Sequence, residues 1–268
     1  MEIQAEVEYW NDFSYAFYRK LLTVCAQRHA ILPLRAFTGP SAKNSPRIHL
    51  RHDLDVCLSA AIEMAEQEVD LGISATYMVI PTSLLYSIRG REGRGRVRRL
   101  QKLGHEIAIH FDFSTSGIGS TDDVGAIEDA VTTQCAMISD ITGEPVSSIS
   151  FHRPIPTFLH GPDILFGMVN AYSATLMRAY HADSRGHWRH GNPVSVFENQ
   201  ELPVAQLLVH PIWWGSAHES PPHRVENFFQ RAAKGMNRKM AQDLDQKLAD
   251  TRLDVPRAGL LVTSEGES

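Results

Sequence analysis

Along the chain, segments in which apolar residues recur with the period of a strand alternate with segments in which they recur with the period of a helix. This pattern predicts strands and helices in turn. Residues 48–54 alternate with the period of a strand, and residues 58–71 have a helical composition that ends at Gly72. Further strands are predicted at residues 74–80, 106–110, 147–151, 174–180 and 206–209, and helices at residues 10–31, 97–103, 124–142 and 222–253.

Strands that alternate with helices indicate βαβ units and a parallel sheet. The chain has 268 residues, which suits one (β/α) barrel, because such barrels exceed about 200 residues without dividing. We expect a single domain with three parts. These are an N-terminal helix and loop packed on the barrel (1–46), the barrel core (47–220), and a C-terminal helix with a frayed tail (221–268).

The bulk composition excludes several classes of protein. A net charge of −5 argues against nucleic-acid binding, which usually needs a basic surface. One basic cluster, at residues 89–99, is read as a solvated loop, with contact to an anionic substrate as the alternative. The three cysteines are far apart and form no C-x-x-C pair, so neither a disulfide framework nor a zinc ribbon is expected.

The chain shows no membrane or export signal. Residues 1–10 carry acidic side chains and lack the apolar segment of a secretory signal. No run approaches the roughly 18 apolar residues of a membrane span. We therefore expect a cytoplasmic protein that acts on a small molecule or glycan.

Polar clusters follow five of the strand-like runs. In (β/α) barrels the chemistry lies on the loops after the carboxyl ends of the strands, so these clusters predict one shared site. The clusters are Asp53 with Asp55, His110 with Asp112, His152 with Arg153, Asp183, and His210.

The first two clusters favour a metal site. Asp53 and Asp55 share a strand face, and two close carboxylates are stabilised when one binds a cation and the other acts as a base. The alternative for Asp55 is a helix cap before Leu58. His110 and Asp112 also share a face, and imidazole and carboxylate both bind divalent ions.

The other clusters offer positioning and acid groups. Arg153 can hold a carboxylate in bidentate fashion, and Asp183 can orient an arginine or a histidine. His210 titrates near neutrality and suits a general acid. Trp188 and Trp213 are candidates for sugar contact, with ordinary packing as the alternative for Trp188.

The absence of other motifs narrows the chemistry. The chain has no Gly-rich phosphate loop, no G-x-S-x-G elbow and no H-E-x-x-H sequence. Nucleotide hydrolases, serine hydrolases and zincins are therefore disfavoured.

From residue 48 to residue 214 the motifs resemble the polysaccharide deacetylase family, also called NodB-like or carbohydrate esterase family four. His52-Asp53-Leu54-Asp55 takes the place of the usual T-F-D-D, like the H-D-V-D variant branch. Arg153-Pro154 matches the third motif, Asp183 and Trp188 match the fourth loosely, and Leu208-Val209-His210 matches the fifth. The second motif departs from the family: His110 matches its first histidine, but Ser114 stands where the second should be.

The resemblance implies a fold and a set of roles. The fold is an α/β, NodB-like, distorted (β/α) barrel of seven strands. Asp53 would be the base, Asp55 and His110 metal ligands, and His210 the acid. Arg153 would hold Asp53, and Asp183 would hold Arg153. Asp112 or His152 would supply the missing ligand.

The predicted activity is metal-dependent removal of an acetyl group from an N-acetylated or O-acetylated sugar or sugar precursor. The expected cofactor is a divalent ion, with zinc first and cobalt, iron or manganese as alternatives. Two other functions stay open. One is hydrolysis of another non-peptide carbon–nitrogen bond in a small metabolite. The other is a catalytically silent barrel that binds a glycan or a partner.

Overall fold

The alternating segment around residues 47–54 becomes a strand with three partners in one nine-stranded sheet, in the order β6-β7-β5-β4-β3-β2-β9-β8, with β1 beside β2. All pairings are parallel except that of β6 with β7. The strands are β1 (Ala30–Leu32), β2 (Arg47–Leu54), β3 (Thr76–Val79), β4 (Glu106–Asp112), β5 (Ser148–His152), β6 (Ile164–Leu165), β7 (Met168–Asn170), β8 (Tyr180–Ala182) and β9 (Val204–Val209).

This computed structural model describes residues 12–39, 46–200 and 202–251. The expected lack of a signal segment in residues 1–10 and the expected fraying at the end of the chain concern residues outside these ranges. The chain divides into two compact units, Met1–Pro221 and Pro222–Ser268.

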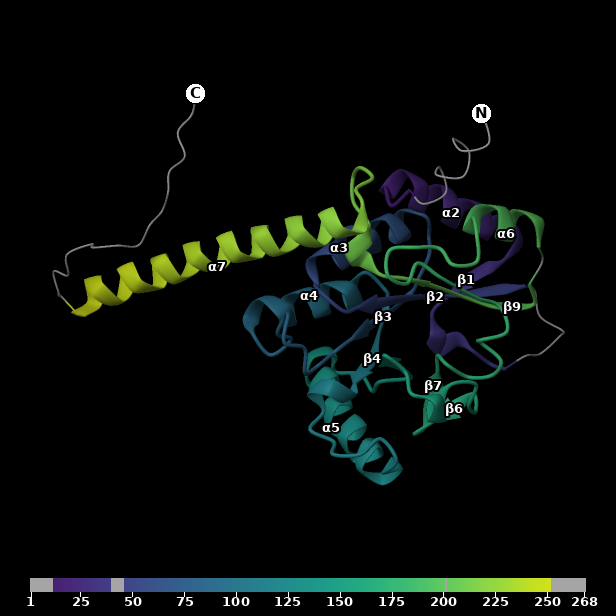
Figure 1. Cartoon of the computed structure of the whole chain (residues 1–268), viewed down its shortest axis with the longest axis horizontal. Coiled ribbons are helices and arrows are strands. Elements are labelled where there is room, and N and C mark those ends of the chain that lie inside the picture. The colour runs from purple at the N-terminus through teal and green to yellow at the C-terminus, as the bar shows by residue number, and fades with distance from the viewer. Residues whose placement is uncertain (1–11, 40–45, 201, 252–268) are drawn as a thin grey trace. The chain divides into compact units, whose positions relative to one another are not determined.

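The sheet of the first unit curls and is flanked by helices, which confirms the predicted distorted (β/α) barrel (Figure 1). Seven strands run parallel along the main path, the expected number: β8, β9, β2, β3, β4, β5 and β7. Among the described residues β6 and β8 form the two edges and do not pair with each other, so the barrel is open on that side.

Helices follow the strands as the sequence predicts. Among the described residues of the first unit, the α-helices are α2 (Tyr15–Arg28), α3 (Ser59–Asp70), α4 (Arg91–Lys102), α5 (Val124–Thr142) and α6 (Pro193–Asn199). Helix α2 ends before the predicted residue 31, where β1 begins instead, and α6 was not predicted. Helix α3 packs on α4, and α4 on α5, outside the sheet (Figure 1). The predicted bounds of α5 match the structure, because Asp123 caps its first turn and Gly143, at φ 74°, ends it.

Helix α4 begins earlier than the predicted residue 97. Its first turns contain Gly93 and Gly95, which lower helix propensity and suggested a loop. A side chain at position 93 would collide with the backbone oxygen of Ser87. Close packing of the preceding loop therefore requires glycine inside this helix.

The strand predicted at residues 174–180 is wrong for most of its length. The carbonyl and hydroxyl of Ser173 accept the N–H groups of Met177 and Leu176, which closes a turn. Only Tyr180 continues into a strand, the short β8. Local hydrogen bonding to a serine here overrides the apolar pattern.

The two faces of the sheet have different cores. Helices α2 to α5 cover the outer face, where a large apolar cluster includes Tyr77, Ile107 and Ala205. A smaller cluster lies on the inner face and includes Met78, Ala108 and Val204, the alternate residues of the same strands. Leu34 and Phe37 belong to this inner cluster.

A buried polar network on the outer face centres on Glu68 of α3. Its carboxylate accepts hydrogen bonds from Tyr18 at 2.5 Å and Tyr77 at 3.0 Å, and pairs with His52 at 2.7 Å. His105 lies beside it and contacts the backbone of Ala65. His52 therefore faces away from the neighbouring aspartates and belongs to the packing of α2 and α3.

Buried His49 makes stability depend on pH. Its Nδ1 donates to the carbonyl of Pro33, and burial lowers its pKa from 6.5 to about 4. The unfolded chain therefore binds a proton at higher pH than the folded one, so stability is lost as pH falls below 6.5. Between pH 7 and pH 5 this histidine should cost about 2 kcal/mol.

Urea unfolding of the wild type and of His49→Asn at both pH values checks this expectation. Asparagine keeps a donor for Pro33 and cannot titrate. The stability advantage of the wild type should shrink by about 2 kcal/mol from pH 7 to pH 5. An equal pH dependence of the two proteins would contradict the assignment.

The second unit contains most of helix α7 (Pro221–Thr251), which corresponds to the helix predicted at 222–253. Phe229, Met236 and Met240 are exposed on it. Within the described ranges, no helix combines the length and apolarity needed to cross a bilayer.

Candidate active site

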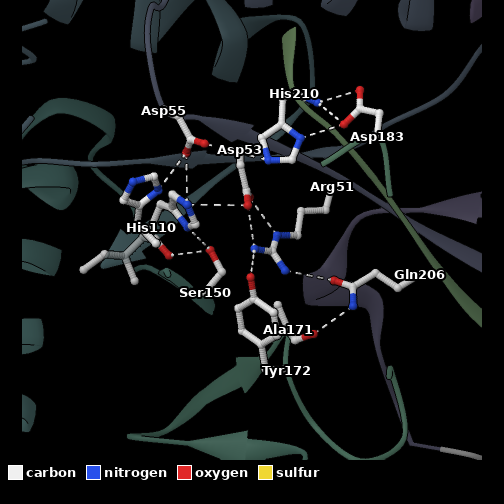
Figure 2. A network of polar contacts seen from close by, with 12 residues as sticks. Arg51, Asp53, Asp55, His110, Ser150, Ala171, Tyr172, Asp183, Gln206 and His210 are labelled. Atoms are coloured by element: carbon white, nitrogen blue, oxygen red, sulfur yellow. Dashed lines mark hydrogen bonds and ion pairs between the residues drawn. The ribbon is translucent and has the colours of Figure 1, made fainter. Parts of the chain in front are cut away.

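The polar site lies where β2, β4, β5 and β9 end on the inner face of the sheet. Register places Asp53 level with Ala108, two residues before His110, and pairs His110 with Ser150. On the other side Arg51 pairs with Leu208, two residues before His210. At least one residue of each predicted strand-end cluster therefore lies at this shared site, and Figure 2 labels Asp53, Asp55, His110, Asp183 and His210 among them.

Asp55, His110 and His152 form a candidate metal centre. One ligand atom from each lies within 4.8 Å of the others. Nε2 of His110 is 3.2 Å and Nδ1 of His152 is 3.3 Å from Oδ1 of Asp55. That oxygen is buried and receives no hydrogen bond from the described residues. A carboxylate and two imidazoles around an unsatisfied buried oxygen fit a divalent cation.

Of the two residues proposed for the third ligand, the structure brings His152 into this cluster. Asp112 pairs with His152 in the register of β4 and β5, but its carboxylate binds elsewhere. Its Oδ1 accepts hydrogen bonds from the backbone N–H and hydroxyl of Ser114, at 2.9 and 2.8 Å. Asp112 thus caps the short helix η2 (Phe113–Thr115) and lies outside the metal cluster.

Ser150 orients His110. Its hydroxyl lies 2.6 Å from Nδ1 of His110 and 3.5 Å from the carbonyl of Ile109. A hydroxyl that donates to this carbonyl accepts from Nδ1, which leaves the Nε2 lone pair facing the carboxylates. A hydrogen bond on the far nitrogen is the usual means of aligning a metal-binding histidine.

Asp53 is held by an arginine that differs from the expected one. Arg51 donates to both of its carboxylate oxygens at 2.7 Å, from Nε and Nη2 (Figure 2). Arg153 is exposed in the turn after β5, at φ 55°, and no ion pair joins it to Asp53 or Asp183. The predicted chain from Asp183 through Arg153 to Asp53 is corrected, because strand alternation puts Arg51 on the same face as Asp53.

Asp183 instead supports His210. Its fully buried carboxylate contacts Nδ1 of His210 at 2.6 Å and also accepts from the backbone N–H of His210 and the indole of Trp214. Nε2 of His210 then lies 3.8 Å from Oδ2 of Asp55. Burial lowers the pKa of His210, but the carboxylate of Asp183 outweighs it and raises that pKa to about 9.

The cationic and imidazole side chains around Asp53 and Asp55 also lower the pKa values of these two carboxyl groups. Burial raises the pKa of Asp53, yet Arg51 and then His110 bring it below its ordinary value. Burial likewise opposes ionisation of Asp55, and the imidazoles of His110 and His152 hold its pKa well below the usual range. Both carboxylates are therefore ionised at neutral pH.

The two candidate sugar-binding tryptophans have different positions. Trp188 is 2% exposed and meets Trp214 edge to face, so it belongs to the core. A buried indole has no free face for a sugar, and the prediction for Trp188 is corrected to packing. Trp213 is partly buried in η4 (Pro211–Trp213), directly after His210, and its sugar-binding role stays a prediction.

No protein-family model matches the chain, and a search of curated proteins finds no relative. Solved structures with a similar chain path include a carbohydrate esterase family 4 pseudoenzyme from Bacillus anthracis, at 12% identity and TM-score 0.41. That alignment covers 74% of this chain and 66% of the other, so the chain spans slightly under two thirds of that protein.

Two further structures carry related names. A family 4 acetyl xylan esterase from Clostridium thermocellum, in complex with cobalt, has 14% identity and TM-score 0.41, over 69% of this chain and 84% of the other. The catalytic domain of a peptidoglycan N-acetylglucosamine deacetylase from Eubacterium rectale has 16% identity and TM-score 0.43, over 75% of this chain and 90% of the other. At such scores the assignment of function rests on the residues of the site.

Sequence reasoning did not give roles to Arg51, Ser150, Tyr172 or Trp214. Arg51 carried a usable signal, because it stands two residues before Asp53 in a predicted strand and must share its face. Ser150 has the same relation to His152. Tyr172 lies in an irregular turn, and only the tertiary structure brings it to Arg51.

Proposed function

We propose that the protein is a metal-dependent hydrolase that removes an acetyl group from an N-acetylated or O-acetylated sugar or sugar precursor. One observation carries the proposal. Asp55, His110 and His152, which could hold a metal ion, border both a buried carboxylate held by arginine and a buried histidine held by aspartate. Metal-assisted hydrolysis of an acetyl group uses a Lewis acid, a base and an acid in such proximity.

A divalent ion held by Asp55, His110 and His152 would supply Lewis-acid activation of the acetyl carbonyl and of water. Zinc, cobalt, iron and manganese all accept this donor set, and zinc is our first choice. Two observations support a metal ion at this place. Oδ1 of Asp55 is buried without a hydrogen bond from the described residues, and Ser150 aligns the imidazole of His110.

Asp53 is the proposed base. Its Oδ2 lies 3.5 Å from Nε2 of His110, so the carboxylate borders the metal cluster without being one of its three ligands. Both oxygens bind Arg51, and each keeps a further lone pair with which to accept a proton. As water adds to the acetyl carbon, its proton passes to this carboxylate.

His210 is the proposed acid. Its Nδ1 is bound to Asp183, so Nε2 is the nitrogen that faces the cluster. When the bond between the acetyl carbon and the sugar nitrogen or oxygen breaks, a proton from Nε2 neutralises the leaving amine or alkoxide. The products are acetate and the deacetylated sugar.

Metal analysis and acetate release test the proposal together. The purified full chain is loaded with zinc or cobalt, dialysed and analysed for bound metal. It is then incubated with N-acetylglucosamine oligomers and with O-acetylated xylan. We expect about one ion per chain, because the described residues contain one group that could hold a metal ion, and we expect acetate release to depend on that metal. No bound divalent ion and no acetate with either metal would overturn the proposal and favour a silent binding barrel.

A further inference from the structure

We infer that Arg51 is the positioning residue for Asp53, in the role that the motif pattern gives to Arg153. The inference rests on the proposed function, because it concerns how the base of that reaction is held. It adds an arginine from the same strand as the base, two residues before it, to the machinery of the site.

The contact between the two side chains is bidentate and buried. Arg51 is fully buried, and Asp53 is 3% exposed. Nε donates to Oδ1 and Nη2 to Oδ2, both at 2.7 Å. A fork of this kind fixes both the place and the rotation of a carboxylate, whereas a single donor leaves it free to rotate.

The guanidinium is itself held on its other edges. Nη2 donates to the hydroxyl of Tyr172 at 3.1 Å, and the Tyr172 ring lies 4.7 Å from the guanidinium carbon. Nη1 reaches Oε1 of Gln206 at 3.4 Å, and Nε2 of Gln206 donates to the carbonyl of Ala171 at 2.8 Å. These contacts from β9 and the turn after β7 keep Arg51 in one rotamer (Figure 2).

Arg153 lacks the geometry for this role. It follows β5 in a left-handed backbone conformation, and it is exposed. The fork of Arg51 already occupies one side of the Asp53 carboxylate with two short contacts. An exposed arginine in a turn cannot replace a donor that is buried on the strand of the base.

Three matched substitutions test the inference: Arg51→Gln, Arg153→Gln and, as a surface control, Arg178→Gln. Arg51→Gln should lower kcat for acetate release by about 10- to 100-fold, because misplacing a base by about 1 Å costs that much. KM and bound metal should stay close to the wild-type values, since Asp55, His110 and His152 are untouched. A loss in Arg153→Gln that exceeds the loss in Arg51→Gln overturns the inference.

A second readout separates positioning from general structural damage. If Arg51 acts through Asp53, then Arg51→Gln should lower kcat little further in an Asp53→Asn background. Fully additive losses in the double variant would show that Arg51 acts elsewhere, and would overturn the inference.

A replacement variant covers misfolding of Arg51→Gln, and the activity of the wild type separates the two proposals. If Arg51→Gln does not fold, Arg51→Lys replaces it, because lysine keeps the charge but loses the fork, and wild-type kcat in that folded variant overturns the inference. Wild-type protein that releases no acetate refutes the proposed function itself. Wild-type protein that is active alongside an equally active Arg51→Gln refutes only the role of Arg51.

Discussion

Asp53→Asn is expected to lower kcat for acetate release by about 10³-fold, because general-base catalysis contributes roughly 10²- to 10⁴-fold. Asparagine keeps the shape of the side chain and one acceptor for Arg51, but it cannot take a proton at neutral pH. Initial rates with the zinc-loaded enzyme and N-acetylglucosamine oligomers measure the effect.

Bound metal is the control for this variant. Asp53 is not among the three clustered ligands, so Asp53→Asn should retain the ion. Full activity in Asp53→Asn would show that another group accepts the proton. Loss of both metal and activity would instead move Asp53 into the ligand set.

His152→Ala is expected to lower the affinity for zinc by at least about 100-fold, since even the partners behind a metal ligand are worth 10- to 100-fold. Removal of this imidazole leaves Asp55 and His110 alone, and two ligands do not complete a stable zinc site. Competition with a chromogenic chelator at constant pH measures the dissociation constant.

Asp112→Ala is the matched comparison, because Asp112 lies opposite His152 on the neighbouring strand. Its carboxylate is occupied by Ser114, so we expect the zinc affinity of this variant to stay near that of the wild type. If Asp112→Ala weakens zinc binding as strongly as His152→Ala, the third ligand has been assigned wrongly.

Much of the fold could be predicted from local patterns. Strand β2 alternates apolar and polar residues, β9 ends in an apolar run, and helix α5 carries both of its end signals, so local pattern and capping residues identify them. The short strands β1, β6 and β7 could not be predicted, since two or three residues hold no complete period. They exist because longer neighbours supply their hydrogen bonds.

In the site, too, some features follow from the sequence alone and others depend on the tertiary structure. The sequence by itself determined that Asp53, Asp55, His110, His152 and His210 lie at or just beyond the carboxyl ends of strands, and the parallel order of those strands implies that these ends meet at one edge. This information is local, because strand alternation depends only on neighbouring residues.

Only the tertiary structure decided which side chain contacts which. It assigned His152 rather than Asp112 to the metal cluster, Arg51 rather than Arg153 to Asp53, and Asp183 to His210. Trp188 was settled in the same way as a core residue. Such choices depend on register between strands and on the turns that follow them, and these are set by packing between segments distant in the chain.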